Sequence, residues 1–130
     1  MVPRYNRSHI QLTDLPPIDF VIITHNHYDH LERQSIQALQ SSHFIVPLGV
    51  DAALRGWGIK PENITELGWQ DSFTDSQSTL IAETAVHYSG RGLGDRNKTL
   101  WNSYIIKSPQ YKIFWSGDSG YGTHFQTIGK

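Results

Sequence analysis

Runs of apolar and polar residues along the chain predict an ordered series of strands and helices. Ile18 to Thr24 is a short, β-branched apolar run directly after a Pro-Pro pair, a pattern typical of a buried strand. From Leu31 to Gln40 the apolar residues lie on one side, which predicts a helix. His43 to Val46 predicts a second strand, and Leu48 to Trp57 a second helix that a glycine ends.

The rest of the chain is richer in strand patterns. Four further strands are predicted, over Ile64 to Leu67, Thr79 to Val86, Leu100 to Lys107 and Tyr111 to Ser116. Asp71 to Ser78 is polar and predicts turns, Ser89 to Thr99 predicts a loop, and a helical turn is expected near Thr123. The order βαβαβ followed by β-rich chain predicts a mixed α/β fold. No linker divides the chain, so we expect a single domain over residues 1–130.

Composition excludes several classes of protein. The 130 residues, of which 38% are hydrophobic and 18% charged, are typical of a globular domain with its own core. A formal net charge of −1 argues against nucleic-acid binding through a broad basic surface. No apolar run approaches the roughly 20 residues that span a bilayer. Because the chain has no cysteine, a metal site would have to use histidine and carboxylate ligands.

Three of the seven histidines fall in one short motif, His25-Asn26-His27-Tyr28-Asp29-His30, directly after the first predicted strand. If the chain stays extended there, His25, His27 and Asp29 can converge on one point, because alternate side chains of a strand share a face. A turn before the predicted helix would direct Asp29 and His30 toward a second ion. Imidazole and carboxylate ligands without sulfur suit zinc.

The run from Ile22 to Leu31 resembles the core motif of the metallo-β-lactamase superfamily. Within it, the chain is similar to the branch that contains N-acyl-phosphatidylethanolamine-hydrolysing phospholipase D and its bacterial relatives. Three later stretches agree with that branch in order and spacing: His87-Tyr88-Ser89-Gly90-Arg91-Gly92, Asn97-Lys98-Thr99-Leu100-Trp101 and Ser116-Gly117-Asp118-Ser119-Gly120-Tyr121. The resemblance extends from about Leu15 to Gly129.

The resemblance implies an αββα sandwich and a dinuclear zinc site. It implies that His25, His27 and His87 hold the first ion, that Asp29 and His30 hold the second, and that Asp118 bridges both. The chain accounts for about one half of the sandwich plus its central strands, so we expect a domain that is truncated at both ends.

The superfamily has one more histidine ligand, several tens of residues after the position of Asp118, and this chain contains no counterpart. The first metal site is therefore expected to be the more secure one. His124 lies too close to Asp118 to match that ligand and is predicted to be a surface residue. Exposed sheet edges predict association with a second copy of the chain.

Two adjacent divalent ions lower the pKa of a shared water, so that hydroxide is available near neutral pH to attack a phosphodiester. Asp118 would orient the ions, and Asp29 would help to position the water. Tyr28, Tyr88, Arg91 and Lys98 are candidates for contacting an anionic substrate, although packing and solvation are the commoner roles for such residues.

We therefore expect a metal-dependent hydrolase that acts on a small-molecule or phospholipid phosphodiester, in the cytoplasm or at the periphery of a membrane. A lactone or ester hydrolase is an alternative, since the same metal site serves several reactions. A further alternative is a catalytically incomplete fragment that acts as a regulatory or nucleic-acid-binding module.

Overall fold

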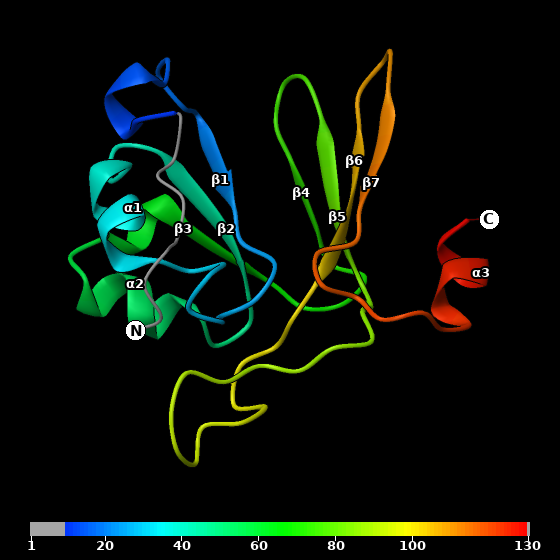
Figure 1. The fold of residues 1–130 in the computed structure, drawn as a ribbon. Helices are drawn as coiled ribbons and strands as arrows, with labels where there is room; N and C mark the ends of the chain where they lie inside the picture. The colour runs from blue at the N-terminus through cyan, green and yellow to red at the C-terminus, as the bar shows by residue number, and fades with distance from the viewer. Residues whose placement is uncertain (1–9, 130) are drawn as a thin grey trace.

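The computed structural model describes residues 10–129, and their strands form two sheets (Figure 1). The first sheet is parallel and has the order β1 (Phe20–Ile22), β2 (His43–Pro47) and β3 (Ile64–Leu67). The second sheet is antiparallel and has the order β4 (Ser72–Thr74), β5 (Thr79–Glu83), β6 (Ser103–Lys107) and β7 (Lys112–Trp115). Residues 1–9 and 130 of the predicted domain lie outside the described residues.

The helices lie outside the two sheets. They are α1 (Arg33–Ala38), α2 (Asp51–Gly56) and α3 (His124–Ile128), with 3₁₀ turns η1 (Leu12–Asp14) and η2 (Pro61–Asn63). Figure 1 shows α1 and α2 on the outer side of the first sheet, and α3 beyond the second sheet. The predicted βαβαβ order followed by β-rich chain, and the α/β fold, are therefore confirmed.

Strand β2 connects the two parts of the hydrophobic core because it is buried on both faces. Phe44 and Val46 belong to a cluster with residues of α1 and α2, including Ile36 and Leu54. Ile45 points to the opposite face, where it joins a cluster formed with β5 and β6. This alternation follows from the two-residue period of a strand, and it explains why the run is continuously apolar.

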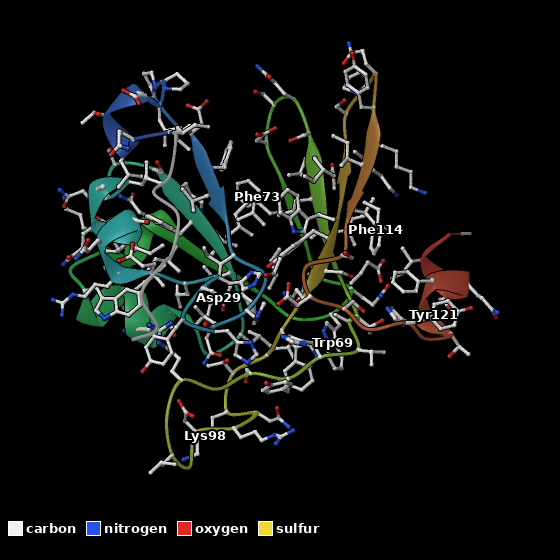
Figure 2. The ribbon with its side chains drawn as sticks, viewed as in Figure 1. Asp29, Trp69, Phe73, Lys98, Phe114 and Tyr121 are labelled. Carbon is white, nitrogen blue, oxygen red and sulfur yellow. The ribbon has the colours of Figure 1, made fainter. Side chains whose placement is uncertain are left out.

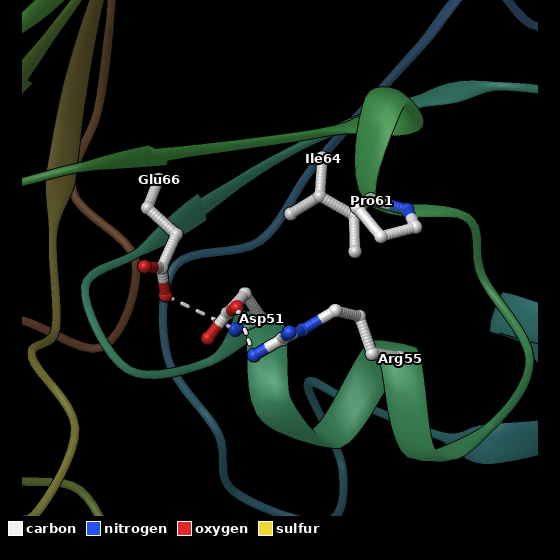
Figure 3. Close-up of a pocket in the computed structure, with 5 residues that line it drawn as sticks. All are labelled: Asp51, Arg55, Pro61, Ile64 and Glu66. Atoms are coloured by element: carbon white, nitrogen blue, oxygen red, sulfur yellow. Dashed lines mark hydrogen bonds and ion pairs between the residues drawn. The ribbon is translucent and has the colours of Figure 1, made fainter.

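The start of α2 is held by a charged group of the neighbouring strand. The Oε1 atom of Glu66 accepts hydrogen bonds from the backbone N–H groups of Gly49 (2.6 Å) and Asp51 (3.1 Å). Arg55 forms an ion pair of 2.8 Å with Asp51, and these groups line a hollow of about 260 Å³ together with Pro61 (Figure 3). The carboxylates of Glu66 and Asp51 are thus paired with the N–H groups at the start of α2 and with Arg55. This hollow therefore has a structural role.

The prediction for residues 71–78 was wrong in part, because it did not include β4. Ser72–Thr74 pairs with β5, and Phe73 packs against the second core cluster. A three-residue edge strand with one apolar side chain shows too short an alternation to stand out among turn residues.

Both predicted helices are shorter than their apolar patterns. The first begins at Arg33, because the carboxylate of Glu32 caps it by accepting the N–H of Ser35 at 2.8 Å. The second begins at Asp51, after the turn that Glu66 holds.

Candidate metal centre

Three imidazole rings meet where the chain leaves β1 and where it follows β5. The Nε2 atom of His25 lies 3.0 Å from Nδ1 of His27, and Nε2 of His87 lies 3.2 Å and 3.3 Å from these two atoms. A tetrahedral zinc ion with Zn–N bonds of about 2.05 Å places its ligands about 3.3 Å apart. The three nitrogens therefore have the spacing that one zinc ion requires.

A second group of ligand atoms shares His25 with the first. It consists of His25, His30 and Asp118, whose ligand atoms all lie within 4.8 Å of one another. The Oδ2 atom of Asp118 lies 3.0 Å from Nε2 of His30 and 3.9 Å from Nε2 of His25. The Asp118 side chain is 43% exposed, so this side of the centre is accessible to a small molecule.

Asp29 is the one predicted ligand that lies outside both groups among the described residues. Its Oδ2 atom is 3.7 Å from Nε2 of His30, and its side chain is 81% exposed (Figure 2). Asp29 lies within a turn, because the N–H groups of His30 and Leu31 both bond to the carbonyl of His27. The expected convergence of Asp29 with His25 and His27 on an extended segment is therefore wrong. Its role as a ligand of the second ion remains a prediction.

His25 is held as a neutral imidazole. Its residue is 1% exposed, and burial, followed by the three neighbouring imidazoles, lowers its pKa to about 4. The hydroxyl of Thr24 lies 2.9 Å from Nδ1, so Nδ1–H can donate to it while the Nε2 lone pair faces the other ligands. Burial also lowers the pKa of His87. Both rings therefore offer lone pairs to a metal near neutral pH.

Strand β6 holds the segment that carries the histidine motif. The backbone N–H of Asn102 donates to the carbonyl of Thr24 at 2.8 Å, and the buried hydroxyl of Tyr104 donates to the carbonyl of Ile23 at 2.8 Å. These bonds replace the strand pairing that β1 loses as it reaches the motif. The second sheet therefore positions ligands that belong to the first.

The loop over residues 89–99 binds the histidine motif from the other side. Nη1 of Arg91 donates to the carbonyls of Asn26 (2.8 Å) and Leu31 (2.7 Å), and its guanidinium lies 4.1 Å from the centre of the Tyr28 ring. The N–H of Gly90 donates to Oδ1 of Asn26 at 2.7 Å. Arg91, a candidate for substrate binding, thus supports the backbone of the motif.

The other candidate contacts lie on the surface around this loop. Tyr88 packs its ring 4.6 Å from that of His27 and 4.9 Å from that of His87, and it is 44% exposed. Lys98 is exposed on the loop, which projects from the body (Figure 2). Only Tyr88 of these two directly adjoins the ligands.

Sequence reasoning did not find several supporting residues. Asn26 lies inside the motif, where its position could have indicated a supporting role. Arg91 and Tyr104 bond to residues that lie more than 60 positions away in the sequence. Gly117 has a φ of 56°, and a Cβ atom there would lie 3.0 Å from Cβ of Thr24. A glycine is therefore needed for the Asp118 turn to approach the motif.

The layered α/β fold, with a cluster of histidine and aspartate side chains between its two sheets, is typical of the metallo-β-lactamase class of proteins. The chain belongs to the metallo-β-lactamase superfamily, since the family described as "Beta-lactamase superfamily domain" matches residues 2–130. The resemblance stated from the sequence is thereby confirmed.

Three curated relatives illustrate the similarity. The chain is 43% identical over 123 residues to an uncharacterized protein of Mycobacterium tuberculosis (strain ATCC 25618 / H37Rv), covering 92% of this chain and 33% of that protein. It is 30% identical over 139 residues to N-acyl-phosphatidylethanolamine-hydrolyzing phospholipase D 1 of Caenorhabditis elegans (98% and 39%). It is 34% identical over 119 residues to the mitochondrial enzyme of that name in Saccharomyces cerevisiae (85% and 25%). The chain thus spans 25% to 39% of the length of these relatives.

Two solved structures share the fold. CmlA, a diiron β-hydroxylase from Streptomyces venezuelae, superposes with a TM-score of 0.73 at 15% identity, over 98% of this chain and 26% of that one. A putative metal-dependent hydrolase from Parabacteroides distasonis gives a TM-score of 0.63 at 25% identity, over 84% and 48%. The chain therefore has part of a metallo-β-lactamase fold.

Proposed function

We propose that the chain supplies the metal centre of a zinc-dependent phosphodiesterase that acts on phospholipids. The observation that carries this proposal is the three-histidine group with a second pair of ligand atoms, from His30 and the exposed Asp118, directly beside it. Relatives named as phospholipase D enzymes, at 30% and 34% identity, favour a phosphodiester over a lactone or another ester.

The proposed ligands form two sets, one for each ion. His25, His27 and His87 would hold one ion, and His30 with Asp118 and Asp29 would hold the other. When bound, such a pair lowers the pKa of water and stabilises the negative charge that develops on phosphoryl oxygens. The exposed carboxylate of Asp29, beside His30, would accept a hydrogen bond from the attacking water and orient it.

The spacing of the first group supports zinc. Imidazole and carboxylate ligands suit zinc and non-haem iron alike, and the fold neighbour CmlA is named a diiron enzyme. The three nitrogens at 3.0–3.3 Å are compatible with a tetrahedral ion, which is the geometry that zinc prefers, and the metal-replacement test below separates zinc from iron.

An apolar groove next to the second ligand group supports a substrate with hydrocarbon chains. The groove has a volume of about 360 Å³ and is lined by Ile22 of β1, Ile106 of β6 and Trp115 of β7. Asp29 and His30 also line it. An amphipathic phosphodiester could place its phosphate at the ligands and its apolar part along these side chains.

A phospholipid substrate places the protein at a membrane surface. Within residues 10–129, no helix combines the length and apolar character needed to cross a bilayer. The cytoplasmic location expected from the sequence remains a prediction.

The test combines metal analysis with a substrate panel. The purified protein should bind zinc and should hydrolyse bis-p-nitrophenyl phosphate and N-acyl-phosphatidylethanolamine, and both activities should disappear with EDTA and return with Zn²⁺. The Asp118→Asn variant is the control, because it keeps the three-histidine group. Turnover of p-nitrophenyl acetate or a lactone without any phosphodiester turnover would overturn the choice of substrate, and restoration by Fe²⁺ but not Zn²⁺ would overturn the choice of metal.

A further inference from the structure

Ser119 and His124 form a hydrogen-bonded pair beside Asp118 that the proposed reaction does not use. The Ser119 hydroxyl donates to the carbonyl of Gly120 (2.9 Å) and accepts the backbone N–H of Val86 (3.0 Å). Nε2 of His124 lies 2.9 Å from the same oxygen. When the hydroxyl hydrogen is donated to Gly120, Nε2 of His124 carries a hydrogen and donates it to Ser119.

The surroundings of His124 favour the tautomer with its hydrogen on Nε2. The sequence predicted a surface residue, and His124 is half-buried, with its Nδ1 atom buried without a hydrogen-bond partner among the described residues. With the hydrogen on Nε2, the buried Nδ1 atom has only a lone pair, whereas the other tautomer would bury an N–H group without an acceptor. A Cβ atom at Gly122 would lie 2.8 Å from Nδ1, so the glycine makes room for the ring.

The pair connects two segments that carry ligands. Ser119 directly follows Asp118, and Val86 directly precedes His87. Besides the bond from Val86 to Ser119, the N–H of Gly120 donates to the carbonyl of Val86 at 2.8 Å. The turn that contains Asp118 is therefore attached to the segment that contains His87.

We propose that Ser119 and His124 are positioning residues that hold the carboxylate of Asp118 against His25 and His30, and so set the affinity for metal bound through Asp118. This inference rests on metal binding at the centre of the proposed function, and not on which bond is hydrolysed. His25 and His27 are held by other contacts, and only His87 shares the attachment through Val86. The three-histidine group should therefore lose less affinity than the part that depends on Asp118.

Zn²⁺ titration of the metal-free protein tests the inference. The zinc binding that Asp118→Asn loses relative to wild type defines the part of the binding that depends on Asp118. Ser119→Ala and His124→Leu should weaken that part about 10-fold, the lower end of the effect of losing a supporting contact around a metal. Gly122→Ala should act in the same direction by displacing the ring. His124→Gln, whose amide can still donate to Ser119, should restore binding.

His43→Leu is the matched control. His43 begins β2, and its Nε2 atom lies 2.8 Å from the hydroxyl of Thr65, so this variant also removes a bond between a histidine and a hydroxyl. It should reduce stability without changing zinc affinity, and circular dichroism should show that every variant is folded. The inference is overturned if His124→Leu keeps wild-type affinity, if His43→Leu loses as much, or if Asp118→Asn binds as wild type does.

Hydrogen exchange separates this inference from the proposed function. In the metal-free protein the amide of Val86 should exchange faster in Ser119→Ala than in wild type, because it loses its acceptor. If the exchange and zinc results hold but no phosphodiester is cleaved, only the proposed function fails. Unchanged exchange at Val86 would overturn the positioning role even in an active enzyme.

Discussion

Each part of the metal centre is supported by a residue that is not itself a ligand. Thr24 holds the ring of His25, and Arg91 holds the backbone of the histidine motif. Such supporting contacts commonly change metal affinity by 10- to 100-fold. Two substitutions with matched controls test this dependence at the scale of single residues.

Thr24→Val should lower zinc affinity at least about 10-fold, because it removes the hydroxyl that bonds to Nδ1 of His25 and orients the ring, while the shape of the side chain is kept. Thr65→Val is the matched control, since it removes the hydroxyl next to His43. Competition with a chromophoric chelator measures both variants. Equal losses in the two variants would show that the hydroxyl of Thr24 has no particular role.

Arg91→Lys should destabilise the protein by about 2 kcal/mol, because an ammonium group cannot reach two carbonyls and stack on Tyr28 in the same way. Arg55→Lys, which alters an ion pair within α2, should change stability by less than about 0.5 kcal/mol. Urea denaturation of both variants measures the difference. A loss no larger in Arg91→Lys than in Arg55→Lys would contradict this account.

At the scale of elements, the sequence predicted the order of strands and helices because β2 and its neighbours carry strong apolar patterns. It did not predict β4, whose three residues contain one apolar side chain. The histidine motif was visible because its candidate ligands lie within six positions of the sequence and follow a strand. The contacts of Arg91 with the motif and of Ser119 with Val86 were not visible, because they depend on how the loops after β5 and β7 pack.

The turn after β7 provides a test at this scale. Gly117→Ala should destabilise the protein by about 1–2 kcal/mol and weaken zinc binding, because φ is 56° and the new Cβ would press on Thr24. Gly56→Ala in α2 is the control: nothing lies within 4 Å of its added Cβ, and it should stabilise by about 0.5 kcal/mol. Thermal unfolding of both variants should give shifts of opposite sign.

At the scale of the whole molecule, the centre joins the two sheets. His25, His27 and His30 follow β1 of the first sheet, whereas His87 follows β5 and Asp118 follows β7 of the second. Metal binding should therefore stabilise the fold as a whole. Strand β7 leaves Ile113 and Trp115 more than half exposed, so association of two copies through this region remains a prediction, as does the single domain.

The stability of the metal-free protein should fall as the pH falls from 6.5 toward 4. The folded state holds the pKa of His25 at about 4, below its usual value of 6.5, so the unfolded chain binds more protons across this range. A difference of this size corresponds to a loss of up to about 3 kcal/mol, and the lowered pKa of His87 acts in the same direction. Urea denaturation in EDTA at several pH values measures the slope, which should be smaller in His25→Asn than in wild type. An equally steep slope in His25→Asn would assign the acid sensitivity to other groups.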